Sequence, residues 1–473
     1  MHSTSRRDFI AAGAALVVAS ALPARAQVET NRKPNVFLML ADDLRPDGLG
    51  ALGGAVAKTP TFDAIIERGC IFRKAYTMGS MIGAVCLPSR TMILTGHSLF
   101  RAKNEASTDD PATHTFPRAM KEAGYATCHA GKFGNSPKKV TEEFDVSVDP
   151  GRSEGVADAV IDFIRARPAD KPMFIYMAGP EPHDPQYAPD EYYMQYKPED
   201  IPVPHAFAPY HPFDNGWLTG RDEMTLPFPR TPENIRGKLA RYYASIAYLD
   251  AEFGRVVQTL KDTGEYDNTI LVIAGDNGLS LGEHGLLGKQ NLYEFGGMHV
   301  PLVFAGPGIP KGETNALAYL MDLFPTLCDL AGIELRSRVE GKSLAPVILK
   351  KTEGVREWLY TAYEKGQRSV TDGRWKLIRY PLIDKTQLFD LESDRHEEHD
   401  LANLPEYAGR VKAMMEKLSE LQREYDDPAP LTAEVIQPAE WSPEKLTPEQ
   451  IQYQKEETAR SGSNEAFEAS RKK

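Results

Sequence analysis

Two pairs of adjacent side chains carry oxygen atoms that could bind a metal ion. Asp42 and Asp43 follow one short apolar run, and Asp276 and Asn277 follow another. Carboxylates and an amide carbonyl are ligands that suit a hard cation such as Ca²⁺ or Mg²⁺. Either pair alone could simply cap a helix or a turn. Because both pairs come directly after apolar runs of strand length, together they favour a divalent cation site.

A second set of side chains is basic and lies in segments that connect the expected strands and helices. Its members are Arg90, Lys132, His183 and Lys289. If they meet in one pocket with a cation, they form a clamp for an anion. Lysine and arginine would stabilise charge on a tetraoxo group during its transfer, and histidine could move a proton. This pattern allows either phosphate or sulfate ester hydrolysis.

A cysteine, Cys86, stands in the stretch "GAVCLPSRTMILTG" at 83–96 and is predicted to lie in a loop rich in Gly, Pro and Ser. The other three cysteines, Cys70, Cys128 and Cys328, lie in or beside apolar segments and are expected to be small buried side chains. The spacings of the four cysteines show no disulfide framework. Cys86 therefore needs an explanation of its own.

The elements that must position these residues alternate between strand and helix. Apolar runs predict strands at 34–40, 71–76, 125–131, 173–179, 268–275 and 300–306, and helical periodicity predicts helices at 59–69, 115–124, 155–167 and about 233–262. This alternation predicts an α/β fold with a large, mostly parallel sheet sandwiched by helices. Ligands of such sheets bind beyond the carboxyl ends of the strands, which is where the two oxygen-bearing pairs lie.

The pattern changes at about residue 355. Alternating segments with turn glycines predict a small antiparallel sheet, and an amphipathic helix follows at 405–427. We therefore expect a large domain over 27–354, a C-terminal subdomain of antiparallel sheet plus helix over 355–430, and a polar, loosely held tail over 431–473.

The first 26 residues have the features of an export signal. Arg6 and Arg7 precede an apolar stretch of small residues and a small-x-small site at 24–26. Residues 1–26 are therefore expected to be a twin-arginine signal peptide, which predicts a periplasmic or secreted protein. No later stretch has the roughly 18 apolar residues that a membrane span needs. The net charge of −12 argues against broad nucleic-acid binding.

The five residues "CLPSR" at 86–90 resemble the C-x-P-S-R signature of type I sulfatases. Further segments resemble that family in the same order: "NVFLMLADDLRPDGLG", "GYATCHAGKFGN", "PEPHDPQY", "VIAGDNGLSLGEHGLLGKQNLYE" and "HVPLVFAGPGI". The resemblance runs from about residue 34 to 405 and implies an alkaline-phosphatase-like fold. The details "DDLRP", "GEHG" and "HVPL" are similar to iduronate-2-sulfatase-like members.

The resemblance implies a role for each candidate residue. A formylglycine-generating enzyme would oxidise Cys86 to formylglycine, whose hydrate has one hydroxyl to attack sulfur and a second to expel sulfate. Arg90 would orient this aldehyde, Lys132 and Lys289 would hold sulfate oxygens, and His183 would protonate the leaving alcohol. The cation, Ca²⁺ in most of the family with Mg²⁺ possible, would be held by Asp42, Asp43, Asp276 and Asn277.

One position departs from the family pattern. The family commonly has histidine two residues after the lysine, in G-K-W-H, and Gly134 takes that place here. That histidine is often assigned as the base for sulfate elimination. His129, Lys132 or water could serve instead, although His129 alone is more simply interpreted as a core or surface residue. His284, in "GEHG", is interpreted as a residue that orders its loop.

These observations leave three functions open. The first is hydrolysis of a sulfate ester on a carbohydrate, met outside the cell. The second is hydrolysis of phosphonate or phosphate esters, since members of the same superfamily can share C-x-P-S-R. The third is a non-catalytic homologue that binds sulfated glycans, which only Gly134 supports. The sequence assigns no oligomeric state.

Overall fold

The central sheet of this computed structural model, which describes residues 32–102 and 114–462, has nine strands. They are β1 (Asn35–Ala41), β2 (Cys70–Tyr76), β4 (Ala126–Gly131), β5 (Val146–Val148), β6 (Met173–Gly179), β7 (Thr269–Gly275), β8 (His299–Val300), β9 (Leu302–Ala305) and β10 (Gly312–Tyr319). Their order is β10-β2-β9-β7-β1-β6-β4-β5, and β8 pairs with β2. Among the described strands of this sheet, β2 pairs antiparallel with β8 and β9, β7 pairs antiparallel with β9, and the remaining pairs are parallel. The predicted mostly parallel sheet is confirmed.

The neighbouring strands β7, β1 and β6 are buried on both faces, as apolar runs without alternation predict. Strand β1 shows this most simply because each of its residues is buried. Phe37 and Met39 point into one core and Val36, Leu38 and Leu40 into the other, since successive side chains of a strand face opposite sides.

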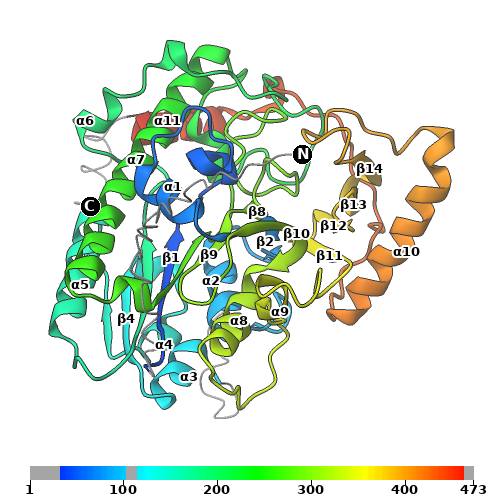
Figure 1. Cartoon of the computed structure of the whole chain (residues 1–473). Coiled ribbons are helices and arrows are strands. Elements are labelled where there is room, and N and C mark those ends of the chain that lie inside the picture. Colours follow the sequence, from blue (N-terminus) through cyan, green and yellow to red (C-terminus); the bar gives the residue numbers. More distant parts are fainter. Residues whose placement is uncertain (1–31, 103–113, 463–473) are drawn as a thin grey trace, which may run out of the picture. The chain divides into compact units, whose positions relative to one another are not determined.

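Helices cover both faces of this sheet (Figure 1). One face carries α1 (Pro60–Ile66), α5 (Ser153–Ala166), α6 (Asp190–Tyr193) and α7 (Pro232–Asp262), and the other carries α2 (Cys86–Thr95), α3 (Phe116–Glu122), α4 (Lys138–Thr141), α8 (Leu323–Leu330) and α9 (Ala345–Ile348). The longest, α7, begins where Thr231 caps the backbone N–H of Asn234 and Pro232 takes the first helical position. Among the residues that the structure describes, no helix is both long and apolar enough to cross a membrane.

A second sheet has the order β14-β13-β12-β11-β3. Its strands are β3 (Gly79–Ser80), β11 (Leu359–Tyr363), β12 (Gln367–Thr371), β13 (Trp375–Tyr380) and β14 (Lys385–Asp390), and α10 (Ala408–Glu424) packs Met414 and Leu418 against it. The antiparallel strands and the helix agree with the sequence, but β3 comes from the segment just before Cys86. Gly79 is required there, because a Cβ would lie 1.9 Å from the carbonyl oxygen of Ala362. The C-terminal sheet thus holds the chain that leads to Cys86.

The segment expected as a polar tail is not loosely held where the structure describes it. It contains α11 (Pro448–Gly462), from which Gln454 and Thr458 donate hydrogen bonds to the carbonyl oxygens of Leu226 and Met224. The domain boundaries stay predictions. The predicted signal peptide lies outside the described residues.

A buried ion pair joins the large sheet to the C-terminal part. The Asp322 carboxylate accepts hydrogen bonds from the backbone N–H of Tyr319 and Lys342 and from Arg356, at 2.5 to 2.8 Å. Asp322→Ala leaves the buried Arg356 guanidinium without this carboxylate, so we expect the free energy of unfolding to fall by about 3–5 kcal/mol. Denaturant titration measures it. Asp329→Ala, at the exposed end of α8, is the control, and equal midpoints for the two variants would contradict the prediction.

Candidate active site

Four neighbouring strands of the large sheet deliver the predicted site residues to one edge. In the order β7-β1-β6-β4, the carboxyl ends are followed by Asp276, by Asp42, by the turn that carries His183, and by Lys132. The parallel register places these strand ends level, since Ala41 pairs with both Gly275 and Gly179. The sheet therefore brings together the side chains that the sequence placed after separate strands.

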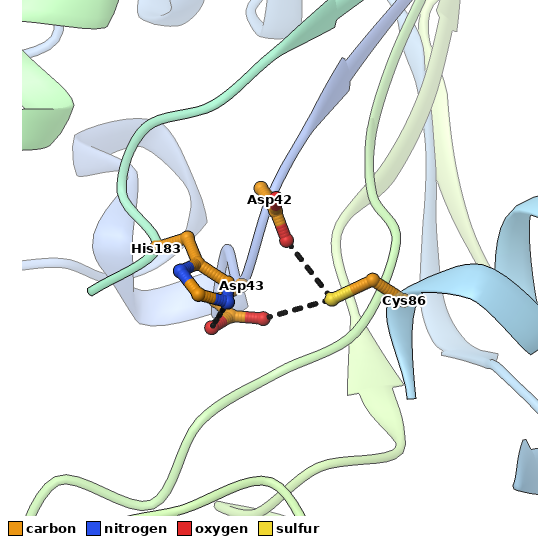
Figure 2. Close-up of side chains that lie close together, drawn as sticks. All are labelled: Asp42, Asp43, Cys86 and His183. Atoms are coloured by element: carbon orange, nitrogen blue, oxygen red, sulfur yellow. Dashed lines mark hydrogen bonds and ion pairs between the residues drawn. The ribbon is translucent and has the colours of Figure 1, made fainter. Parts of the chain in front are cut away.

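Cys86 enters this cluster from the amino end of helix α2. It is the first residue of the helix, so the expected loop position is wrong. A helix tolerates Pro88 in its first turn because the N–H groups there have no partner within the helix. The Sγ atom lies 3.0 Å from Oδ1 of Asp42 and 3.6 Å from Oδ1 of Asp43 (Figure 2). The hydroxyl of Ser89 donates to the carbonyl oxygen of Asp276 at 2.6 Å and ties the helix to the end of β7.

Asp43 connects the two oxygen-bearing pairs. Its backbone is left-handed, with φ of 69°, a conformation that costs free energy for a residue other than glycine and often marks a functional site. Its N–H donates to Oδ1 of Asp276 at 3.1 Å, and its own Oδ1 accepts from the Asn277 amide at 2.6 Å. Hydrogen bonds therefore join three of the four predicted cation ligands, and the fourth, Asp42, adjoins Asp43 in the chain.

Two buried, positively charged side chains, Arg90 and Lys289, contact these residues. Arg90 places Nε 2.8 Å from Asp276 and Nη2 3.4 Å from Asp42. The Nζ atom of Lys289, from the loop between β7 and β8, lies 2.6 Å from Oδ1 of Asp43 and 3.1 Å from Sγ of Cys86. Arg90 therefore orders the carboxylates behind the cysteine, whereas Lys289 contacts the cysteine itself.

Lys132 and His183 lie at the more open side of the cluster. The Nζ of Lys132 is 3.6 Å from Oδ2 of Asp42, and about a third of its side chain is exposed, 34%. The Nε2 of His183 is 3.9 Å from Oδ2 of Asp43. Its Nδ1 donates to the carbonyl oxygen of Asp184 at 2.8 Å, because a carbonyl can only accept. Burial and the neighbouring Lys132 lower the pKa of His183 to about 3, so the neutral ring presents Nε2 as an acceptor.

The electrostatics of the cluster do not activate a thiol. Burial raises the pKa of Cys86 well above its ordinary value, and the carboxylate of Asp276 raises it further. Burial also raises the pKa of Asp43 to about 7, although Lys289 opposes that rise. Since the thiolate is the nucleophilic form of cysteine, an unmodified Cys86 is a poor nucleophile here.

The oxygen atoms of the cluster fit a divalent cation. Within the described residues, Oδ1 of Asn277 is buried and has no hydrogen-bond partner, as expected for an oxygen that binds an ion. Ligand atoms of Asp42, Asp43, Cys86 and His183 all lie within 4.8 Å of one another. Carboxylate and amide oxygens are typical ligands of Ca²⁺ and Mg²⁺.

Sequence reasoning missed Asn135, whose amide donates to Oδ2 of Asp42 at 2.7 Å. The short 3₁₀ turn Phe133–Asn135 carries it there, and Gly134 beside it has nothing within 4 Å of where a Cβ would be. Only its place next to Gly134 could have indicated Asn135.

The two other histidines considered in the sequence analysis, His129 and His284, pack against aromatic rings. His129 is fully buried, packs against the rings of Phe133, Phe144 and Tyr176, and shares a hydrogen bond with Ser147. His284 stacks on Tyr293 at 4.0 Å, and its carbonyl oxygen accepts from His211. His129 is thus excluded as the elimination base, and His284 orders its loop.

Comparison with known proteins identifies the family. Residues 34–333, more than half of the chain, match the family described as Sulfatase. The chain belongs to the sulfatase family. Residues 282–424 of this sulfatase also match the C-terminal family described as N-sulphoglucosamine sulphohydrolase. Family membership places it among the sulfuric ester hydrolases. The finer resemblance to iduronate-2-sulfatase-like members stays a prediction.

Curated relatives cover most of this sulfatase. It is 26% identical to an N-acetylglucosamine-6-O-sulfatase of Bacteroides thetaiotaomicron, over 89% of this chain and 92% of the relative. It is 29% identical to a choline-sulfatase of Rhizobium meliloti, over 80% of this chain and 84% of the relative.

Solved structures share its fold. One was determined in complex with its substrate D-glucosamine-2-N,6-O-disulfate and has a TM-score of 0.72 at 23% identity, over 85% of this chain and all of that one. A phosphonate monoester hydrolase of Agrobacterium radiobacter has a TM-score of 0.69 at 22% identity, over 83% of this chain and 96% of that one. At these identities the likeness establishes the fold alone.

Proposed function

We propose that this sulfatase hydrolyses sulfate esters of a carbohydrate with a formylglycine made from Cys86 and a divalent cation, Ca²⁺ or alternatively Mg²⁺. The observation that carries the proposal is the position of Cys86, whose Sγ lies 3.0 Å from Asp42 and 3.1 Å from Lys289. A formylglycine-generating enzyme is the partner that this chemistry requires. The cation ligands are Asp42, Asp43, Asp276 and Asn277.

The two groups that the chain would carry supply different chemistry. The hydrated aldehyde provides a hydroxyl nucleophile at sulfur, and the cation acts as a Lewis acid. Around them, Arg90 holds Asp42 and Asp276 in place, while the ammonium groups of Lys289 and Lys132 stabilise negative charge on sulfate oxygens.

His183 is proposed to donate a proton to the oxygen of the leaving alcohol. Its Nδ1–H is engaged by the carbonyl oxygen of Asp184, which leaves Nε2 for the substrate. A bound sulfate would favour the charged ring, because a nearby anion raises the pKa of histidine, and the protonated Nε2 can then donate to the alcohol oxygen. For the elimination of sulfate, water is proposed as the base in place of the histidine that Gly134 replaces, since the Lys132 ammonium has no lone pair to accept a proton.

The alternative is hydrolysis of phosphonate or phosphate esters, because the ammonium groups of Lys289 and Lys132 beside Asp43 and Asp42 can stabilise negative charge on these anions as well. Paired rate measurements on an aryl sulfate, an aryl phosphonate and an aryl phosphate decide between them, with protein co-expressed with a formylglycine-generating enzyme. We expect kcat/KM to be at least about 10-fold higher for the sulfate. A large preference for the phosphonate would reverse the assignment.

The place of action is proposed from residues outside the described part. The paired Arg6 and Arg7 support export by the twin-arginine route to the periplasm or the medium. A carbohydrate sulfate released from a polymer would meet the enzyme there.

Asn135 is expected to support the cation site by orienting Asp42. Partners that orient metal ligands typically change metal affinity when they are removed, so Asn135→Ala should weaken divalent cation binding about 10-fold. The thermal midpoint of the protein, followed as Ca²⁺ is titrated, measures this affinity. Asn268→Ala, at the last residue of the short turn before β7, is the control. Unchanged cation affinity in Asn135→Ala would show that Asp42 needs no such partner.

A further inference from the structure

One pocket extends from the reaction centre to the start of helix α5. It encloses about 320 Å³ and includes Lys132 and His183 together with Arg152 and Tyr187. This volume is at the lower end of the range for ligand pockets, so the pocket suits one sugar unit better than a long oligosaccharide. Lys132 and His183 have roles in the proposed mechanism, whereas Arg152 and Tyr187 have none.

Arg152 is held in a defined orientation on the pocket wall. It directly precedes Ser153, the first residue of α5, and its guanidinium carbon lies 3.3 Å from the centre of the Tyr187 ring. Its Nη1 is 3.7 Å from Oε1 of Glu181, and its side chain is 19% exposed. Tyr187 in turn packs edge-on against Tyr248 of α7. A guanidinium on an aromatic face is attracted by the ring and is restricted in its rotamers.

The acidic side chains of the pocket are occupied by donors of the protein itself. Asp149 accepts from the backbone N–H of Phe133 and Gly151, Glu181 accepts from Ser153, and Asp184 pairs with Lys238 and Arg221. These contacts offset much of their negative charge. The lysine and the arginine that line this pocket are Lys132 and Arg152. Lys132 lies beside Asp42, whereas Arg152 lies beside Glu181 and Tyr187.

We propose that Arg152 is a specificity-determining residue that binds a second anionic group, a sulfate or a carboxylate, on the sugar whose sulfate ester is cleaved at Cys86. This inference rests on the proposed function. It specifies that the substrates of the enzyme are sugars with two anionic groups. A planar guanidinium suits such a group because it can donate two parallel hydrogen bonds to two oxygens. Lys132 would then hold the sulfate that is transferred, and Arg152 the group that stays.

Binding to an inactive form separates this proposal from catalysis. In the Cys86→Ala background, calorimetric titration measures Kd for three probes: a hexosamine monosulfate, the matching hexosamine disulfate and a uronic acid monosulfate. We expect a doubly anionic probe to bind more tightly than the monosulfate. Adding Arg152→Ala should raise the Kd of that probe at least about 10-fold and leave the Kd of the monosulfate unchanged. A loss confined to the disulfate identifies a sulfate as the second group, and one confined to the uronic acid identifies a carboxylate.

Two further variants serve as controls. Arg165→Ala removes an exposed arginine from the last turn of α5 and should leave every Kd unchanged, which excludes an effect of net charge. Arg152→Lys keeps the charge without the planar fork and should give an intermediate loss. The proposal is overturned if Arg152→Ala weakens all probes equally or none, or if no doubly anionic probe binds more tightly than the monosulfate. A different outcome would reject only the proposed function. In that case Arg152→Ala weakens binding of the doubly anionic probe as expected, but the enzyme with Cys86 intact cleaves no sulfate ester.

Discussion

Cys86→Ala is expected to abolish turnover and to leave the fold intact. The substitution removes the thiol whose oxidation turns Cβ into the aldehyde carbon, so the nucleophile cannot be made and kcat should fall on the order of 10⁴-fold or more. The side chain contributes little to the core, because it faces the carboxylates of Asp42 and Asp43. Initial rates with an aryl sulfate, together with thermal unfolding of the same preparation, measure both effects.

A second buried cysteine provides the control for this prediction. Cys128, on β4, is fully buried and packs in the apolar core on the face of the sheet that α5 and α7 cover, so Cys128→Ala should keep its activity. Mass spectrometry of the peptide that contains Cys86 should show the aldehyde in the active enzyme. Near-normal activity of Cys86→Ala, or an unmodified thiol in fully active protein, would refute the assigned nucleophile.

Most strands of the large sheet could be predicted because they are short apolar runs, whereas β5 and β10, which carry polar and partly exposed residues, were not predicted. Strand β1, for example, has seven buried residues and is followed at once by two aspartates. In a parallel sheet every strand presents its carboxyl end to the same edge, so finding the strands also located Asp42, Asp276, Lys132 and His183. The cation ligands and the basic residues could thus be predicted from the local sequence pattern together with one rule of sheet topology.

Other features depend on contacts between distant segments and had no local signal. The two-residue strand β3 exists because Gly79 and Ser80 pair with Ala362 and Tyr363, far along the chain. The helix that begins at Cys86 contains a proline and is tied down by the contact of Ser89 with Asp276. Neither partner can be recognised from the neighbouring sequence.

Lys289→Ala should cause the second largest loss of activity. Its ammonium contacts both Asp43 and Cys86, and although burial lowers its pKa, the carboxylate of Asp43 holds that pKa well above the ordinary value. A fixed positive charge beside the reacting group stabilises the charge that develops in the transition state, so its removal should lower kcat/KM on the order of 10² to 10³-fold. Because this charge acts mainly in the transition state, kcat should account for most of the loss.

A matched lysine separates this catalytic effect from lost stability. The side chain of Lys376 is as buried as that of Lys289, 4% exposed in each, and it pairs with Glu294 and Glu397 at 2.9 and 3.0 Å. Removing either lysine leaves carboxylates without a buried counter-charge, so both variants should unfold at lower denaturant concentration. Only Lys289→Ala should lose kcat/KM when activity is measured per folded molecule. Equal losses in the two variants would mean that Lys289 holds the structure and takes no part in catalysis.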